Sequence, residues 1–460
     1  MIKKFSDYFI IIIFSGSLIM AGSCKKSIEL KDIGEFTSET SVTTETDLTD
    51  LINSAYFALA DENYYGGSFQ IYNELLADHL DGTNLGGFFQ AFYNRNTNIF
   101  NSDNASFYGQ INKVIFQSNL VLDNLSIATD ANKNEFEGEA KFLRSIAIFD
   151  LVRMYAQPYT TAGAASQIGI PIRLTGVRQI VQRSTVADAY QLIISDLKTA
   201  ETMLPETNGV NATKWSAKAL LAKVYFQMND FANAYLYADD VLANGGFGFD
   251  TAYNERYSPQ GTSETIFGLV YESGNTQGRF QKLRNNYLTT STALPTLRLT
   301  NAFYTEATAN SDDKRISWYK TNNGFYLLGK FDSASIRLPV IHVTEIKLIF
   351  AESAAEINLN LSVAISDLND IIIRAYGVTS SLILPLTANA TVIIDAARRE
   401  RQLELVGEGN RLQELKRIAA KGEPVTIRGS AFNCPGLIFP FPSNEAIYLG
   451  IPQNPTGGCN

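Results

Sequence analysis

The sequence predicts a mostly α-helical protein, in which a tetratricopeptide-like scaffold of helix pairs is interrupted by a large irregular insertion with short strands. Apolar residues recur at three- and four-residue spacing over most of the chain, which is the pattern of an amphipathic helix. Two segments, 214–247 and 344–377, each predict a helix–turn–helix pair with small residues where the helices cross. The 34-residue period of such repeats is not continuous between them, which predicts one scaffold with an insertion at 248–340.

The first 23 residues have the order of a secretory signal peptide. Lys3 and Lys4 precede a nearly apolar stretch, which is shorter than the roughly 20 residues that span a bilayer, and small residues follow it before Cys24. The triplet AGS before Cys24 is a loose form of the lipobox, at which a bacterial lipoprotein peptidase cuts. We therefore expect Cys24 to be acylated and to anchor the protein in a membrane. The alternative is a plain secreted protein with a stray cysteine.

Residues 24–46 are rich in Ser, Thr and Glu, and we expect them to form a lipidated flexible tether. The chain has 460 residues and a net charge of −9. The signal peptide carries a net charge of +1, so the mature chain is near −10. Because no basic stripe is present, nucleic acid is not an expected partner.

Two cysteines remain once Cys24 is set aside, and these are Cys434 and Cys459. An even pair in an oxidising compartment predicts one disulfide, which would fasten the C-terminal tail. Two free cysteines are the alternative.

The N-terminal helical region is expected to span residues 47–247. Five helices are expected before its helix–turn–helix pair, at about residues 46–60, 70–80, 107–125, 134–156 and 185–204. Thr46 or Asp47 is the expected N-cap of the first helix, and Ser184 or Thr185 that of the last. The C-terminal region, 248–460, is expected to pack with it as one globular unit. Its insertion is rich in Tyr, Asn, Gly, Ser and Thr and contains strand-like runs such as ETIFGLVYE.

Four long segments follow one another in a fixed order behind the lipobox. They are GEAKFLRSIAIFDLVRMYAQPY, GIPIRLTGVRQIVQRSTVADAYQLIISDLKTAETMLP, LPVIHVTEIKLIFAESAAEI and RRERQLELVGEGNRLQELKR. Together they resemble the SusD/RagB family, the surface nutrient-binding lipoproteins of Bacteroidota. The chain departs from the family pattern at His342 and Val343, where Arg-Tyr is usual, and at Leu412, where Trp is common. It also lacks the usual closing Gly-Tyr.

The resemblance implies a protein that faces outward on the outer membrane, binds an oligosaccharide and delivers it to a SusC-type TonB-dependent transporter. A peptide ligand, a surface glycoside hydrolase and a scaffold without a ligand are the alternatives. The sequence has no GxSxG, P-loop or Rossmann motif, and His79 and His342 belong to no metal-binding pattern. We therefore expect no cofactor, metal or catalytic residue.

Two charged motifs have a structural interpretation. Glu139 and Arg144 are expected to be packing and salt-bridge residues between helices. The charges between Arg398 and Arg411 have the opposite-sign spacing of a solvated or network-forming helix.

A ligand surface is expected on loops, which can present aromatic and polar groups that a packed helix cannot. Flat rings stack on the apolar faces of pyranoses. The candidates from the segment LDGTNLGGFFQAFYNRN are Asp81, Asn84, Phe88, Phe89 and Tyr93. Those from the segment RISWYKTNNGFY are Trp318 and Tyr319. Core packing is the alternative for the phenylalanines and for Trp318.

Overall fold

The computed structural model describes residues 42–455 except 178, 254–255, 258–260, 270–279 and 334–336, together with Cys459. The predicted signal peptide, Cys24 and most of the predicted tether lie outside these residues. Within the described residues, no helix is both long enough and apolar enough to cross a membrane.

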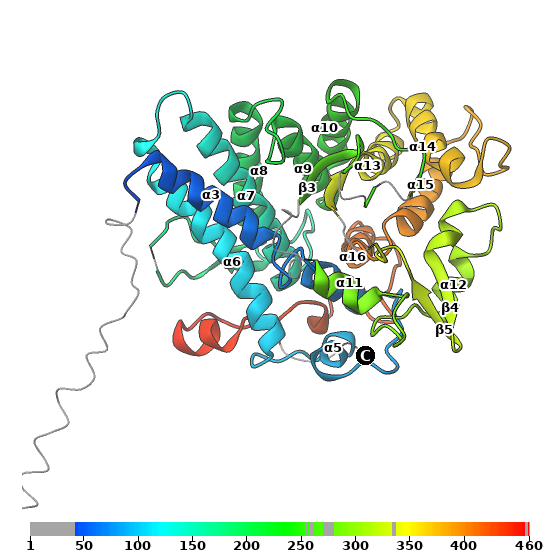
Figure 1. Cartoon of the computed structure of the whole chain (residues 1–460), viewed down its shortest axis with the longest axis horizontal. Coiled ribbons are helices and arrows are strands. Elements are labelled where there is room, and N and C mark those ends of the chain that lie inside the picture. The colour runs from blue at the N-terminus through cyan, green and yellow to red at the C-terminus, as the bar shows by residue number, and fades with distance from the viewer. Residues whose placement is uncertain are drawn as a thin grey trace, which may run out of the picture. The chain divides into compact units, whose positions relative to one another are not determined.

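Six helices of the N-terminal region form a row in which each packs against the next (Figure 1). They are α3 (Glu45–Leu59), α6 (Ser102–Asp123), α7 (Lys133–Tyr155), α8 (Val186–Met203), α9 (Lys214–Gln227) and α10 (Phe231–Asn244). The row continues beyond the insertion, because α10 packs against α13, which in turn contacts α14 and α15. These helices span Val343–Glu356, Leu361–Tyr376 and Ala390–Glu404. The mostly helical fold class is confirmed.

The centre of the row is α7, which is buried on almost every side. From Ala140 to Val152, Lys141 alone is not buried. Gly138 allows α7 to approach the end of α8, since a Cβ there would lie 2.8 Å from the Leu204 side chain. Arg144 joins three helices, as predicted for an interhelical residue: it pairs with Asp196 at 2.8 Å and donates to Asn119 at 2.8 Å.

Helix starts follow local capping chemistry. Thr185 caps α8 through a capping box with Asp188, as predicted. The predicted cap of α3, Thr46 or Asp47, was wrong, because Thr44 caps this helix and its own amide donates a hydrogen bond to the Asp47 carboxylate. The short helix predicted near 70–80 is α4 (Ser68–Leu76). A second short helix, α5 (Gly87–Tyr93), was not predicted because glycines at its start masked it.

Short antiparallel strand pairs shape the rest of the chain. β1 (Ile168–Pro171) pairs with β2 (Arg183–Thr185). β3 (Thr265–Leu269), inside the predicted strand-like run, pairs with β6 (Leu338–His342), so both sides of the insertion meet beside α13. β4 (Tyr319–Asn322) and β5 (Phe325–Leu328) form a hairpin. Its two-residue turn, Asn323-Gly324, has positive φ at both positions, as Asn-Gly favours.

Buried ion pairs fasten the insertion to α15. Glu404 is fully buried and accepts hydrogen bonds from the guanidinium groups of Arg256, Arg315 and Arg374 at 3.1, 3.2 and 3.0 Å. Tyr253 also donates to Glu404, at 2.7 Å. The charged helix predicted around Arg398–Arg411 therefore forms a network through α15 and is not simply solvated, and the partners of Glu404 come from other elements. The described residues also contain the α-helices α11 (Gln281–Tyr287), α12 (Asn301–Ala307) and α16 (Arg411–Ala420).

Candidate ligand-binding face

The two loop segments predicted to carry the ligand surface meet at one edge of the protein. Leu299 forms isolated antiparallel bridges to Leu80 on one side and to Tyr326 of β5 on the other. The amide of Asp81 donates to the Arg298 carbonyl, and the Leu299 amide donates to the Tyr326 carbonyl, both at 2.8 Å. The loop after α4, residues 298–300 and the β4–β5 hairpin therefore form one continuous edge, which we call the ligand face.

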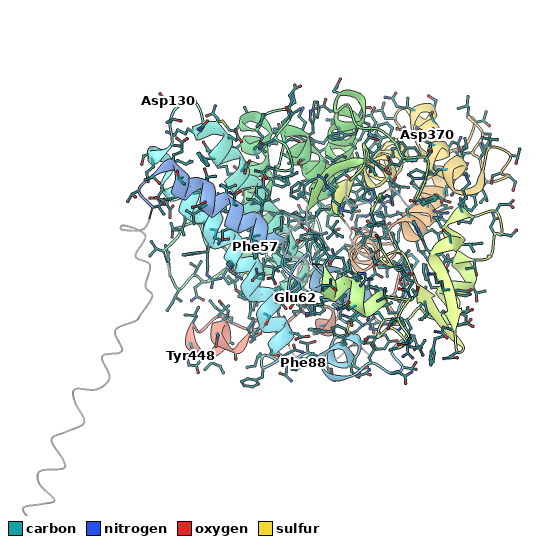
Figure 2. All side chains as sticks on the ribbon, in the orientation of Figure 1. Phe57, Glu62, Phe88, Asp130, Asp370 and Tyr448 are labelled. Atoms are coloured by element: carbon teal, nitrogen blue, oxygen red, sulfur yellow. A yellow bond between two sulfur atoms is a disulfide. The ribbon has the colours of Figure 1, made fainter. Side chains whose placement is uncertain are left out.

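The loop that follows this edge presents both polar and aromatic groups. Asp81 accepts hydrogen bonds from the Thr83 amide and hydroxyl, at 2.9 and 2.6 Å, and this fixes a tight turn. Asn84 is exposed and adopts a left-handed backbone with φ of 65°. Phe88 on α5 is 42% exposed and lies at the lower edge in Figure 2. Phe89 is partly covered, with its ring edge-on to Tyr72.

Tyr93 supports this loop from beneath. The Arg428 guanidinium lies 3.9 Å from the centre of the Tyr93 ring. Gly82 touches the same ring so closely that a Cβ there would lie 2.0 Å from it. With its ring against Arg428 and the Gly82 backbone, the half-buried Tyr93 holds the loop in place.

Trp318 and Tyr319 do not reach the surface, and we correct their assignment to the ligand face. Their exposed fractions are 4% and 7%. The Trp318 ring packs edge-on against Tyr253, at 5.1 Å, and the Lys330 ammonium lies 4.6 Å from it. The physical reason is burial: large aromatic rings supply apolar core to an otherwise polar insertion.

Sequence reasoning missed two aromatic side chains of the same hairpin. Phe325 is half-buried, with the Arg298 guanidinium 4.1 Å from its ring centre. Tyr326 is half-buried against Tyr304, with ring centres 4.4 Å apart. The signal was in the quoted segment itself, because Asn323-Gly324 predicts a hairpin turn, after which Phe325 and Tyr326 face opposite sides of the strand.

The ligand face is therefore a shallow surface of rings and hydrogen-bonding groups. Asn322 and Asn323 are exposed beside Phe325, and Asn84 lies near Phe88 in the chain. This combination suits a ligand with apolar patches and many hydroxyl groups. Among the described residues, no group of three or more His, Cys, Asp or Glu side chains is placed to hold a metal ion.

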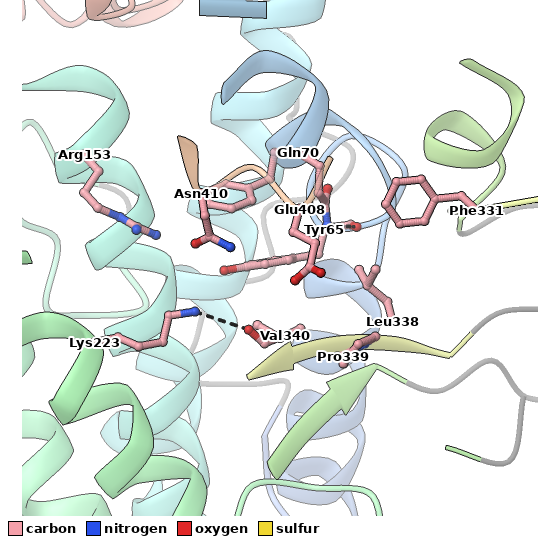
Figure 3. A pocket seen from close by; sticks show the side chains of 11 residues that line it. Tyr65, Gln70, Arg153, Lys223, Phe331, Leu338, Pro339, Val340, Glu408 and Asn410 are labelled. Carbon is pink, nitrogen blue, oxygen red and sulfur yellow. Dashed lines mark hydrogen bonds between the residues drawn. The ribbon is translucent and has the colours of Figure 1, made fainter. Parts of the chain in front are cut away.

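A central cavity, drawn in Figure 3, is too small to serve as an alternative site. It lies between the start of α4, α7, α9 and β6, and its volume is about 20 Å³, room for a water molecule but not for a sugar. The Lys223 side chain lines one wall of the cavity, and its ammonium donates a hydrogen bond to the Val340 carbonyl at 3.3 Å.

Strongly perturbed carboxyl groups lie in the core rather than on the ligand face. Burial alone would raise the pKa of Glu404, but Arg374, Arg256 and Arg315 outweigh it and lower the pKa to about 2. Burial would likewise raise the pKa of Glu264, but Arg256 and Arg374 outweigh it and lower this pKa to about 2. Both groups are therefore permanently ionised structural partners and cannot serve as general acids near neutral pH.

Cys434 and Cys459, the predicted pair, are joined by a disulfide in the structure, with a Cα–Cα distance of 5.5 Å. The bond encloses the C-terminal segment that contains Asn454. The Asn454 side chain donates to the carbonyls of Tyr155 and Phe439, at 2.8 and 2.7 Å. The tail is thus tied to the end of α7.

The fold and the exposed face together define a helical scaffold with an exposed, partly aromatic edge, and comparison with known proteins gives its family. A family model described as starch-binding and associating with the outer membrane matches residues 31–226, and a model of the SusD family matches residues 257–434. This chain belongs to the SusD/RagB family. The matches together cover both sides of the boundary expected near residue 248.

Individual relatives are similar at a greater distance. A SusD-like protein P2 of Formosa agariphila is 26% identical over 252 residues, which are 53% of this chain and 46% of that protein. A SusD-like protein of Bacteroides ovatus is 25% identical over 177 residues, 34% of this chain and 31% of that protein. The chain thus matches less than half the length of these curated relatives.

Solved structures show the same fold. A SusD superfamily protein from Bacteroides thetaiotaomicron has a TM-score of 0.76 and 24% identity, and the match covers 90% of this chain and 100% of that one. A SusD superfamily protein from Bacteroides vulgatus has a TM-score of 0.78 and 23% identity, with 90% and 99% covered.

Proposed function

We propose that this protein binds an oligosaccharide nutrient on the outer face of the outer membrane and delivers it to a SusC-type TonB-dependent transporter. The observation that carries the proposal is the meeting of two loop segments through Leu299, because these segments carry the exposed Phe88 ring, the half-buried Phe325 ring and exposed amides. Membership of the SusD/RagB family, one of whose models is described as starch-binding, supports the same conclusion.

The chemistry of the ligand face favours a sugar. Phe88 offers an exposed ring, and the half-buried Phe325 ring, stacked with the Arg298 guanidinium, is a second aromatic group that can contact the apolar face of a pyranose. Side chains such as Asp81 and Asn322 can bond to hydroxyl groups. A peptide would instead add to the open edge of β4, whose residues Lys320 to Asn322 are exposed.

A binding screen with matched variants tests the ligand face. Phe88→Ala and Phe325→Ala should each weaken oligosaccharide binding tenfold or more, because a lost stacking contact costs roughly 1–3 kcal/mol with nucleobases. Phe116→Ala is the matched control: Phe116 is also 42% exposed but lies on α6. Calorimetry measures affinity and thermal unfolding measures folding. Equal affinity in all variants would place the site elsewhere, and binding of peptides alone would favour the peptide alternative.

We further propose that the protein is not an enzyme. Glu264 and Glu404 have the lowest carboxyl pKa values described above, yet they are buried among arginines and away from the ligand face. Incubation with each glycan that binds should release no reducing ends. If reducing ends are released, and the Asp81→Asn variant no longer releases them, the ligand face hydrolyses its ligand and the protein is an enzyme.

Attachment through Cys24 is the next element of the proposal. The lipobox motivates it, and the Cys24→Ala protein should leave the membrane fraction and lack the acyl mass on its N-terminal peptide. Fractionation in cells without the transporter separates lipid attachment from retention by a partner. A variant that still partitions with membranes in those cells would contradict the anchor.

A candidate surface for the transporter lies on the α6 side of the protein. Several exposed apolar side chains gather on α6, on the loop between β1 and β2, and on residues 444–448: Phe116, Leu174, Val177, Ile180, Ile447 and Tyr448. Arg173 ties these segments together through Glu445 at 2.7 Å and Asn112 at 2.9 Å. Tyr448, 77% exposed, is labelled in Figure 2. Tyr448→Asp should reduce co-purification with the transporter and leave ligand affinity unchanged.

A further inference from the structure

A second hollow lies in the N-terminal helices, on elements that take no part in the ligand face. It is formed by α3, the start of α7 and the loop near Asn211, and its volume is about 230 Å³. That is more than ten times the central cavity and enough for a small organic molecule. Phe136 and Ile52 give it an apolar wall, and the amides of Asn53 and Asn132 give it a polar one.

The charges around this pocket are unbalanced. Glu45, Glu135 and Glu139 line it, whereas no Lys or Arg is among its described lining residues. Glu139 is only 3% exposed, so its carboxylate is held in the wall with little solvent. A buried carboxylate without a counter-charge is costly unless hydrogen bonds or a cation compensate it.

Neutral amides provide the compensation that Glu139 has. Asn208 and Asn211 donate to its carboxylate at 2.6 and 3.2 Å. Burial, with a smaller contribution from the neighbouring Glu135, still raises the pKa of Glu139 to about 7 against the hydrogen bonds from Asn208 and Asn211. This differs from the predicted interhelical salt bridge, because none of the ion pairs described for this protein includes Glu139. The wall therefore has hydrogen-bond donors for the carboxylate but no positive charge.

We propose that this pocket binds a small polyhydroxylated cation, a primary ammonium carried on a sugar or polyol body. The ammonium would pair with Glu139 and Glu135, which supply the negative charge that lacks a partner. The Asn53 amide and the carbonyl oxygen of Asn132, whose NH2 group donates to Glu45, would bond to hydroxyl groups, and the Phe136 ring would cover an apolar face of the ligand. The site is separate from the ligand face, so it extends the proposed function to a second binding event.

The probe is 1-amino-1-deoxysorbitol, and its uncharged match is sorbitol. At pH 8 the mature protein should bind the amine in calorimetry at millimolar concentration or below, and sorbitol should bind at least tenfold more weakly. Affinity for the amine should rise between pH 6 and pH 8, because Glu139 ionises in this range while the probe stays protonated. The titratable groups that face Glu139 are Glu135 on α7 and Tyr56 on α3, and the loop contributes only amides.

Matched variants locate the binding. Glu139→Gln should weaken it at least tenfold, whereas Glu137→Gln on the same helix, whose carboxylate pairs with Lys141 at 2.9 Å, should not. Should Glu139→Gln unfold the protein, Glu135→Gln replaces it, since Glu135 is exposed. Equal binding of sorbitol, no binding of the amine, or an equal loss in Glu137→Gln overturns the proposal. Phe88→Ala should leave amine binding intact, which separates this site from the ligand face.

Discussion

Two buried glutamates, one in each half of the protein, respond to burial in opposite ways. Glu139 on α7 is 3% exposed and Glu404 on α15 is fully buried. Burial raises the pKa of Glu139 to about 7, whereas three arginines overcome burial at Glu404 and lower its pKa to about 2. The comparison shows that the partners of a buried carboxylate, and not its depth, decide its ionisation.

Each half of the protein is stabilised by a different kind of contact, and the partners of the buried charges again make the difference. The N-terminal helices pack through apolar side chains, and the polar groups among them are mostly neutral or paired once, as Arg144 is with Asp196. The insertion is also fastened to α15 by charges that share a partner. Glu404 pairs with Arg256 and Arg315 of the insertion and with Arg374 of α14 at once.

Removal of Glu404 should have the largest effect. Glu404→Ala leaves three buried guanidinium groups without a shared partner, and the loss of one partner from a buried pair typically costs about 3–5 kcal/mol. Urea unfolding measures the change in the free energy of unfolding. Glu206→Ala is the control, because Glu206 is 70% exposed in its pair with Lys214, and exposed pairs contribute about 1 kcal/mol or less. A similar small loss in both variants would remove the contrast between the halves.

Loss of the disulfide should give the next largest effect on stability, and this effect does not depend on charge. Replacing Cys434 and Cys459 with serine opens a link across 25 residues, which should lower the free energy of unfolding by about 3 kcal/mol on the chain-entropy estimate. Because no ionisable group is involved, the loss should be the same at pH 5 and pH 8. Thiol labelling of the unfolded, unreduced wild-type chain provides the chemical check. Two reactive thiols in that chain would contradict the bond.

The sequence predicted the helices well because their pattern is local. Apolar spacing located α6, α7, α8, α13 and α14 within a few residues, and a capping residue located the start of α8. Apolar spacing did not predict α5, because the glycines at its start are typical of a loop. The assignment of Trp318 failed for a different reason: an aromatic residue in a polar segment suits a binding surface and a small core equally well. Only the tertiary packing of Trp318 against Tyr253 distinguishes the two.

The ligand face depended even more on contacts between distant segments. Two loop segments that each looked suitable in the sequence do meet at Leu299, but no local pattern predicts that bridge. The same is true of the partners of Glu139. The sequence around it predicts a salt bridge, and the structure supplies Asn208 and Asn211 from a loop about 70 residues away.

The last effect, and the one that tests the opening comparison most directly, is on the pH dependence of stability. The pKa of Glu139 is higher in the folded protein than its ordinary value of 4.5, so the folded state retains a proton that the unfolded state loses. Its contribution to stability is therefore complete below pH 4.5 and is lost as the pH rises through 7, by up to about 1.4 kcal/mol per pH unit. Glu139→Gln stays neutral, so the variant should lack this decline.

Glu404 contributes with the opposite sign, since its stabilisation is present above pH 4.5 and is lost as the pH falls toward 2. Urea unfolding of wild type and Glu139→Gln at intervals from pH 4.5 to 7.5 measures the difference. If the two curves run parallel, Glu139 has an ordinary pKa in the folded protein, and the contrast between the two glutamates does not hold.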